Sequence, residues 1–468
     1  MLVLTVGLAA RPAYPAPPSA AADAATPPAP ATPVLSIRRV PTFVAKSVAT
    51  ANLRRTVTKI LANPALHADG ASTCLQVTQD GRTLVSVRPD QAMLPASNQK
   101  LLTATAALDR LGPDVRFTTT VRADRAPAGG VEAGNLYLVG AGDPLLRTAA
   151  FVASLPYPEK VQTSLESLAA QIKAAGITRL AGSVVADEVR YDAQRGVTTW
   201  KPSYLADGLV GPLSAVDVND GFVPTHPAEG GSTQPAMEAA STLTRALQAM
   251  GVTVVGPPVS GATPSGAVAV TSISSPPMID VLGAVLRTSD DTGAELITKE
   301  LGKRFGGAGT TAAGVGVVVS TLAADGLAVG GLVAADGSGL DRSDRVSCSL
   351  LVATLSRAGA NGPLASMLPV AARTGTLANR MVDTPAAGRL IAKSGTLDDV
   401  SALSGFVLGR PGGAKAAYQT SPLVFSLIDN GVVATTGEGI ANDLGAALAV
   451  YPSGPDPATL VPAPVVRR

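Results

Sequence analysis

Aromatic, histidine and charged residues are scarce in this chain of 468 residues. Aromatic residues make up 3% of it and charged residues 15%, and the net charge is +2. A protein that binds DNA or RNA is expected to carry a marked excess of lysine and arginine, so no nucleic-acid partner is predicted. No uncharged apolar run reaches the roughly 18 residues of a membrane-spanning helix, so no integral membrane span is predicted for the mature chain.

Histidine and cysteine occur twice each. Neither His67 nor His226 has a cysteine or carboxylate nearby in ligand spacing, so no metal site is expected, and no organic cofactor is implied. The shortage of histidine also argues against a Ser-His-Asp hydrolase. Cys74 and Cys348 allow a single pairing. The sequence leaves two alternatives open, a disulfide in an exported protein or two separately buried thiols.

The N-terminal residues favour an exported protein. Residues 1–10 are apolar and end in Ala9 and Ala10, like the core and cleavage site of a secretion signal that lacks its basic lead-in. The alternative is an apolar tail without a function. Residues 11–33 are mostly proline and alanine, a composition typical of an extended spacer. We therefore expect an extracytoplasmic protein of the cell wall or of a periplasmic-type space.

The length of the chain predicts two or more domains, because a single hydrophobic core does not grow to this size. A helix, a hairpin and a second helix open the ordered part of the chain, and short β-like runs between turns dominate much of the middle. Helical patterns return from residue 278, before a β-rich end that closes with a helix. We expect this middle part to be inserted into a domain formed by the two ends. The expected division is a signal remnant and linker at 1–44, a main domain at 45–115 plus 282–455, inserted subdomains at 116–281 and a tail at 456–468.

Hydrophobic periodicity predicts the main elements. Asp80 and Gly81, between two β-rich runs, predict a hairpin at 73–87. Late strands are expected to join this hairpin in one sheet, covered by helices from both ends of the sequence, in a mixed α/β fold. The predicted helices are 45–63, 97–111, 161–175, 237–250, 278–287, 294–301, 310–324, 346–357 and 440–450. The predicted strands outside the hairpin are 117–121, 135–139, 182–186, 389–393, 401–408 and 423–428.

A serine and a lysine three residues apart open the predicted helix at 97–111. Positions i and i+3 face the same way on a helix, so Ser97 Oγ and Lys100 Nζ are expected to meet. Ser97 would also lie near the positive end of the helix dipole, where negative charge is favoured. A serine beside a lysine that burial can neutralise is one way to make a nucleophile without histidine. Alone the pattern is weak, because S-x-x-K is also common in surface helices.

Two further motifs follow, Ser289-Asp290-Asp291 and a group that begins at Lys393. The order S-x-x-K, S-D-N and K-T-G is the signature of the penicillin-recognising serine enzymes. In such an enzyme Ser97 would attack a carbonyl, and Lys100, unprotonated in the site, would take its proton. Ser289 would relay that proton to the leaving amine.

The third motif, Lys393-Ser394-Gly395-Thr396, is expected to bind the substrate. Lys393, placed at a strand end, would supply a fixed positive charge for a substrate carboxylate, and Ser394 would add a hydroxyl. Gly395 would let the backbone come close to a bound peptide. The backbone N–H groups of Thr396 and Ser97 would form an oxyanion hole, worth roughly 3–4 kcal/mol per donor.

The chain resembles the exported D-alanyl-D-alanine carboxypeptidase/endopeptidases, the class C low-molecular-mass penicillin-binding proteins, over roughly residues 70–450. The resemblance implies a penicillin-binding/β-lactamase-like transpeptidase domain, with an antiparallel sheet covered by helices and a large β-rich insertion of one or two subdomains. Beside the three motifs, the segments that carry the resemblance are 136–144, 207–214, 218–221, 336–340, 368–371, 375–377 and 403–406.

Two residues depart from the family pattern. Ser394 replaces a threonine and keeps the hydroxyl. Asp291 replaces a substrate-binding asparagine, and a carboxylate has no N–H to donate to a substrate carbonyl. Its negative charge would also favour the protonated form of Lys100. Our hypothesis is that Asp291 slows acylation, unless Asp291 is itself held protonated.

The resemblance implies a serine DD-peptidase that hydrolyses D-Ala-D-Ala termini or D-Ala cross-links in the stem peptides of peptidoglycan and is acylated by β-lactams. The alternative is a catalytically impaired protein that keeps the fold and binds cell-wall peptides. A β-lactamase or esterase on the same fold is a second alternative, which the motif spacing does not favour. Asp143 and Asp220 are expected to form turns, and Trp200 and Tyr204 to be packing anchors.

Overall fold

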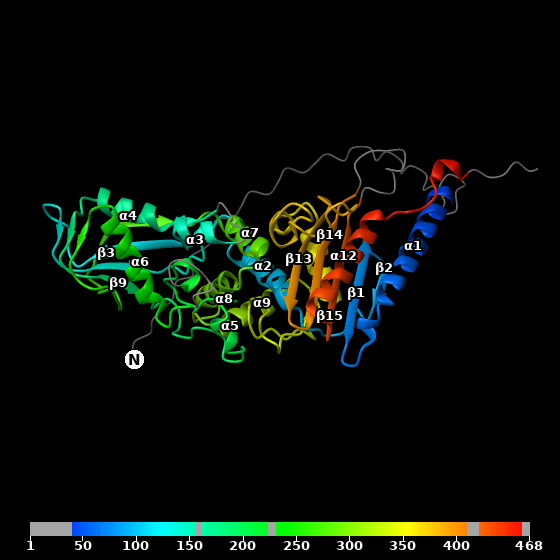
Figure 1. Cartoon of the computed structure of the whole chain (residues 1–468), viewed down its shortest axis with the longest axis horizontal. Helices are drawn as coiled ribbons and strands as arrows, with labels where there is room; N and C mark the ends of the chain where they lie inside the picture. Colours follow the sequence, from blue (N-terminus) through cyan, green and yellow to red (C-terminus); the bar gives the residue numbers. More distant parts are fainter. Residues whose placement is uncertain (1–39, 156–160, 223–230, 410–420, 461–468) are drawn as a thin grey trace, which may run out of the picture.

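The computed structural model describes residues 40–155, 161–222, 231–409 and 421–460. The predicted signal remnant and spacer, up to residue 33, therefore lie outside the described residues. The molecule is elongated, with a long sheet at one end, a group of helices in the middle and smaller sheets at the other end (Figure 1). None of the described helices is both long and apolar enough to cross a membrane.

A five-stranded sheet joins the two ends of the sequence, as predicted. Its strands are β1 (Ser72–Gln79), β2 (Arg82–Val87), β13 (Leu390–Leu397), β14 (Val400–Val407) and β15 (Leu423–Asn430). The order is β13-β14-β15-β1-β2, with every neighbouring pair antiparallel. Asp80 and Gly81 have φ values of 50° and 73° in the turn between β1 and β2, the left-handed conformation that this dipeptide favours.

Helices cover both faces of this sheet. On one face α1 (Val40–Leu61) and α12 (Ala434–Val450) share a buried apolar cluster with the strands. On the other face α10 (Cys348–Ala358) packs against β1 and β15 and contacts α2 (Gln99–Arg110). The sheet is therefore a central layer between helices.

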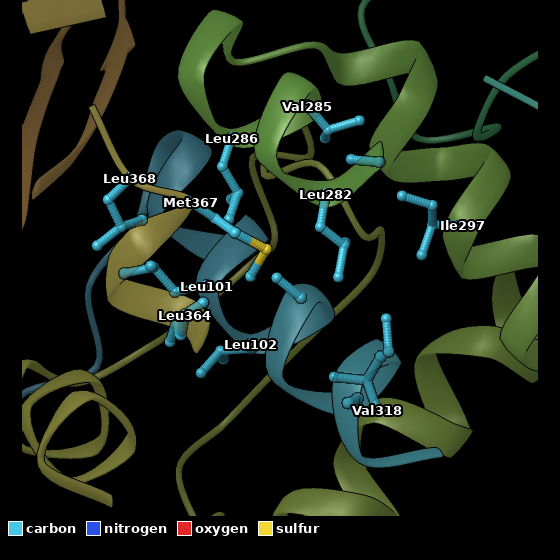
Figure 2. Packing of buried hydrophobic residues seen from close by; sticks show 14 of the residues in the cluster. Leu101, Leu102, Leu282, Val285, Leu286, Ile297, Val318, Leu364, Met367 and Leu368 are labelled. Atoms are coloured by element: carbon cyan, nitrogen blue, oxygen red, sulfur yellow. The ribbon is translucent and has the colours of Figure 1, made fainter. Parts of the chain in front are cut away.

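The helix that follows the first motif is the centre of the helical group. α2 packs against α7 (Met278–Thr288), α8 (Asp291–Phe305) and α9 (Thr311–Ala324). Residues 99–107 of α2 are all buried. Apolar side chains from α2, α7, α8, α9 and the segment around α11 (Pro363–Ser366) pack together in one buried cluster (Figure 2). Those labelled in Figure 2 are Leu101, Leu102, Leu282, Val285, Leu286, Ile297, Val318, Leu364, Met367 and Leu368.

The part of the chain between α2 and α7 forms the smaller sheets. One has the order β11-β9-β5-β3-β12 and contains parallel and antiparallel pairs, a second has the order β10-β8-β4, and β6 pairs with β7. The strands are β3 (Thr118–Ala123), β4 (Val131–Glu132), β5 (Leu136–Val139), β6 (Leu146–Arg147), β7 (Thr163–Ser164), β8 (Arg179–Leu180), β9 (Val184–Asp187), β10 (Thr253–Val254), β11 (Val259–Ser260) and β12 (Val268–Ser274). The helices are α3 (Ala149–Ser154), α4 (Leu165–Ala174), α5 (Ser203–Ala206) and α6 (Pro235–Ala249). We call this part the inserted region; the expected limits of 116–281 stay a prediction.

Several elements differ in their bounds from the predicted ones. α12 begins at Ala434 rather than at residue 440, and α4 begins at Leu165, where Ser164 Oγ accepts a hydrogen bond from Ser167 N at 3.1 Å. β13 runs on to Leu397, so the third motif lies inside a strand and not at its end. Serine and glycine give little strand signal, and the full pairing of β13 with β14 extends the strand through them.

Cys74 of β1 and Cys348 of α10 form a disulfide, so the first of the two alternatives is correct. Their Cα atoms are 6.0 Å apart, and both residues are buried in the apolar core. The bond ties the sheet to the helix that covers it.

A groove of about 650 Å³ lies between α1 and the hairpin of β1 and β2. Its lining includes Phe43, Arg54 and Arg82, and none of the motif residues. This groove is therefore separate from the candidate active site.

Candidate active site

Ser97 lies in a 3-10 turn, η2 (Ala96–Asn98), directly before α2. Ala96 has a φ of 47°, which is uncommon for a residue with a side chain. β13 passes close to this turn, and a Cβ on Gly395 would lie 2.9 Å from Pro95 O and 3.1 Å from Ser97 N. Gly395 was predicted to admit a bound peptide, but the contact between strand and turn already requires a glycine here.

Asn98 fixes the same turn to the sheet. Its Nδ2 donates to Ser404 Oγ at 2.8 Å, and Ser404 Oγ donates to Ser426 Oγ at 2.8 Å. Ser404 belongs to β14 and Ser426 to β15, so the backbone of Ser97 is anchored to the middle of the sheet.

Lys100 is buried beside Ser97, as predicted from their spacing. Its Nζ lies 3.0 Å from Ser97 Oγ and 2.8 Å from Ser338 O, and it also donates to Asp291 Oδ1. These three acceptors match the three N–H donors of an ammonium group. The Lys100 side chain is 1% exposed, so almost no water competes for these bonds.

Asp291 is the ion-pair partner of Lys100. Burial raises the pKa of the Asp291 carboxyl, while the charge of Lys100 and the hydrogen bond from it act in the opposite direction. The Asp291 carboxyl is therefore easier to protonate than the carboxyl of an exposed aspartate.

Ser289 ends α7 in a left-handed conformation, with φ 62° and ψ 34°. Its Oγ accepts a hydrogen bond from Lys393 Nζ at 2.8 Å. Since Ser289 and Asp291 lie two positions apart, one short turn touches both buried lysines.

Lys393 is buried on β13 and also donates to Ser394 O, at 2.7 Å. Burial lowers the pKa of Lys393 well below its ordinary value, and the charge of Lys100 lowers it further. A carboxylate bound at this position would supply the missing counter-charge and stabilise the ammonium form.

The side chains of Ser394 and Thr396, in the third motif, make contacts that the sequence did not predict. Thr376 Oγ1 and Ser394 Oγ are 2.8 Å apart, and Thr396 Oγ1 donates to Glu438 Oε1 of α12 at 3.0 Å. Thr376 belongs to a segment that resembles the family, which is the signal that could have identified it.

The loop that carries Ser338 is held by a buried carboxyl of α8. Glu295 Oε1 accepts from the backbone N–H groups of Gly337 and Ser338, each at 2.8 Å. Burial raises the pKa of Glu295 to about 8, and nearby Asp336 raises it in the same direction. The same loop supplies an acceptor to Lys100, the backbone oxygen of Ser338.

All three motifs meet at one place. Ser97, Lys100 and Asp291 are joined by hydrogen bonds, Lys393 is joined to Ser289, and Gly395 lies against the turn of Ser97. Among the described residues no group of three His, Cys, Asp or Glu side chains is close enough to hold a metal ion.

The residues expected to be structural lie in packed positions. Trp200 and Tyr204 are buried in one small apolar cluster, and Trp200 Nε1 donates to Asp336 Oδ2 at 2.8 Å. Asp143 Oδ1 accepts from Leu145 N at 2.9 Å, the contact of a turn-forming aspartate. Asp220 also lies in a turn, with φ 56°, but in addition it forms a buried ion pair that the sequence did not predict.

A half-buried serine beside a buried lysine at the start of a helix, next to a strand with a second lysine, is the arrangement of a penicillin-recognising acyl-transfer enzyme. The family described as D-Ala-D-Ala carboxypeptidase 3 (S13) matches residues 53–234 and 224–450. The chain belongs to this family, and it is therefore a serine DD-peptidase.

Relatives cover most of the chain. The D-alanyl-D-alanine carboxypeptidase of Actinomadura sp. (strain R39) is 30% identical, over 88% of this chain and 88% of the relative. Carboxypeptidase DacB of Mycolicibacterium smegmatis is 30% identical, over 90% of this chain and 86% of the relative. The crystal structure of penicillin-binding protein 4 (DacB) from Haemophilus influenzae has a similar fold, with a TM-score of 0.68 at 20% identity, over 84% of this chain and 98% of that chain. The same protein has also been solved in complex with a β-lactam, with a TM-score of 0.62.

Proposed function

We propose that Ser97 is the nucleophile of this DD-peptidase and Lys100 its general base. The observation that carries the proposal is the 3.0 Å contact between Lys100 Nζ and Ser97 Oγ, in a site where the lysine is buried. At this distance the proton of the serine passes directly to the lysine as the hydroxyl attacks.

The substrate is a peptide that ends in D-Ala-D-Ala or carries a D-Ala cross-link. Ser97 Oγ forms a bond with the carbonyl carbon of the D-alanyl residue, and its proton moves to Lys100 Nζ. When the tetrahedral intermediate collapses, the C–N bond breaks. The leaving amine takes up the proton from Lys100, relayed through Ser289. Water then attacks the acyl-enzyme and releases the shortened peptide and free Ser97.

The third motif binds the substrate in this mechanism. Lys393 faces the substrate carboxylate, whose charge stabilises the lysine ammonium, and the Ser394 hydroxyl adds a hydrogen bond. The backbone N–H groups of Ser97 and Thr396 stabilise the oxyanion. The close packing of Gly395 on the turn of Ser97 supports this assignment, because it places the two backbone segments beside each other.

Lys100 can act as the base only while Asp291 carries a proton. Burial raises the pKa of Asp291, which favours its protonated form relative to that of an exposed aspartate. In the neutral pair Lys100 is a free amine, and the Asp291 carboxyl donates to it. The ionised pair is inactive, because Lys100 is then an ammonium ion. Only the fraction of the enzyme in which the pair is neutral is therefore active. Asp291 also binds the substrate less well than an asparagine would, because a carboxylate has no N–H to donate to the substrate carbonyl.

The substrates are peptidoglycan stem peptides, and the enzyme works outside the cytoplasm. The relatives are named as D-alanyl-D-alanine carboxypeptidases, and the disulfide between Cys74 and Cys348 is typical of an oxidising compartment. β-Lactams acylate Ser97 in place of the peptide, in line with the β-lactam complex of the similarly folded penicillin-binding protein 4.

A fluorescent penicillin and a set of defined muropeptides test this function. The parent protein is expected to be labelled covalently and to release D-alanine or cleave the cross-link, as followed by mass spectrometry. Ser97→Ala is expected to lose both activities and to keep its thermal midpoint. Binding of muropeptides without acylation would favour a non-catalytic wall protein instead, and rapid turnover of nitrocefin would favour a β-lactamase.

A further inference from the structure

One arginine of the inserted region reaches the turn between α7 and α8. Arg147 of β6 is buried, and its Nη2 donates to Asp290 Oδ2 at 2.7 Å. The same guanidinium donates to Asp220 Oδ1 from Nη2 at 2.8 Å and from Nε at 3.3 Å. Arg147 thus joins a turn of the inserted region to the residue between Ser289 and Asp291.

The turn that Arg147 contacts is conformationally costly. Ser289 has a φ of 62°, and a left-handed residue with a side chain is strained, so its surroundings must hold it in this conformation. Asp290 is the only residue between Ser289 and α8, and it makes two contacts that fix the turn. Its Oδ1 accepts from Gly293 N at 2.8 Å as a helix cap, and its backbone N donates to Val285 O at 3.0 Å.

Arg147 holds the second oxygen of that cap. A capping aspartate with one free oxygen could rotate or take up water, whereas Oδ2 of Asp290 is fixed by a buried guanidinium. Asp290 is followed directly by Asp291, which contacts Lys100, and preceded by Ser289, which contacts Lys393. A shift of this turn would therefore change both lysine contacts together.

Arg147 is the cation in a group of buried carboxyls. Burial raises the pKa of Asp220 to about 7, against the charge of Arg147, and burial raises the pKa of Asp217 well above its ordinary value. Burial raises the pKa of Asp143 to about 6, although the charge of Arg147 acts in the opposite direction. Without the guanidinium, Asp290 would lie beside these carboxyls without its cationic partner, and the hydrogen bonds from Arg147 to Asp290 and Asp220 would be lost.

We infer that Arg147 is a positioning residue for catalysis: through Asp290 it holds the Ser289–Asp291 turn in the geometry in which Ser289 meets Lys393 and Asp291 meets Lys100. This inference rests on the proposed function, because it concerns the same acylation step. It gives the inserted region a part in the chemistry through its contact with the turn that carries Ser289 and Asp291.

Arg147→Met tests the inference, with Arg190→Met as the matched control. Arg190 also belongs to the inserted region and also binds α8, through a two-bond ion pair with Glu300 at 2.7 and 2.9 Å. That pair lies further along the helix, away from the turn. Both substitutions remove one arginine that joins the inserted region to α8, so both are expected to lower the thermal midpoint.

The rate constant of acylation separates the two variants. It is measured by stopped-flow with a fluorescent penicillin, apart from the dissociation constant of the initial complex, at a temperature where every variant is folded. Arg147→Met is expected to acylate about 10–100-fold more slowly with less than a threefold change in that dissociation constant, because a misplaced catalytic group costs up to about 10²-fold in rate. Arg147→Lys, which keeps the charge, is expected to recover part of the rate, and Arg190→Met to stay within about twofold of the parent.

Three results would overturn the inference while the proposed function stands: equal slowing in both methionine variants, an unchanged rate in Arg147→Met, or a change confined to the dissociation constant. A parent protein that is not acylated at all would overturn the proposed function, and the inference with it. A rate that Arg147→Met loses and Arg190→Met keeps supports the inference.

Discussion

Two buried lysines each pair with an aspartate, and α8 supplies one member of each pair. Lys100 pairs with Asp291 in the active site, and Lys299 pairs with Asp192 where the inserted region meets α8, and each lysine side chain is 1% exposed. The first lysine also contacts a serine hydroxyl, whereas the second donates to a backbone carbonyl, Gln194 O at 3.0 Å. Burial and a carboxylate partner are thus common to both lysines, and the contact with Ser97 distinguishes the one that we propose as the base.

The largest effect is expected from removing each lysine in turn. Lys100→Met removes the base, so acylation by a fluorescent penicillin should fall by about 10²–10⁴-fold. Lys299→Met leaves Asp192 without its partner and should lower the thermal midpoint, with an acylation rate within about twofold of the parent. If both substitutions slow acylation equally, the two pairs do not differ in the way proposed here.

Removing the disulfide between Cys74 and Cys348 tests whether it contributes to stability alone or also to the acylation rate. The double substitution Cys74→Ala and Cys348→Ala should lower the free energy of unfolding by roughly 2–5 kcal/mol, because the cross-link restricts the unfolded chain. Urea unfolding measures this loss. The folded double variant should keep its acylation rate, since the disulfide lies in the apolar core between β1 and α10. A slower rate at a temperature where the variant is folded would contradict this separation.

The two aspartates should respond differently to replacement by asparagine. Asp291→Asn removes the negative charge that favours protonated Lys100 and supplies an N–H for the substrate carbonyl, so acylation should rise about tenfold. Asp192→Asn, at the other pair, should leave the rate within about twofold. Stopped-flow acylation at pH 7 measures both. No gain for Asp291→Asn, or a loss, would refute the idea that the carboxylate slows the enzyme.

The smallest effect concerns another buried carboxyl of α8, Glu295, which forms no ion pair with a lysine in the part of the chain that the structure describes. Burial raises its pKa to about 8, so the folded protein binds a proton that the unfolded chain releases near the ordinary value of 4.5. Its contribution to stability is complete below about pH 4.5 and is lost as the pH rises to about 8. Glu295→Gln cannot titrate and still accepts from the loop, so its thermal midpoint should fall less than that of the parent between pH 5 and pH 8.5. Parallel curves would contradict the raised pKa.

Local sequence signals predicted the main sheet and the helix that follows Ser97 better than they predicted the inserted region. The hairpin at Asp80 and Gly81 depends on two adjacent residues, and the meeting of Ser97 with Lys100 depends on one turn of helix. The strands of the main sheet are six to eight residues long, which is enough for an apolar, β-rich run to be recognised in the sequence. Most strands of the inserted region are short, and β6 and β8 have two residues each, too few for a period of two to be visible.

The role of Arg147 could not be predicted for a different reason. Its contact with Asp290 joins residues 143 positions apart, and nothing in the sequence around either residue specifies the other. The same holds for the contact between Thr376 and Ser394, which depends on how two segments pack after folding. Motifs identify side chains that act within one turn or strand, whereas the residues that hold those turns come from packing over long separations.

The disulfide closes a ring of chain that contains the first two motifs and the whole inserted region, because its cysteines are 274 positions apart. A protease that cuts once inside the inserted region would therefore produce a two-chain protein and not two proteins. The nicked molecule would run as one band without reductant and as two bands with it. Loops of the inserted region can in this way be cut while Ser97 and Lys393 remain in one covalent unit.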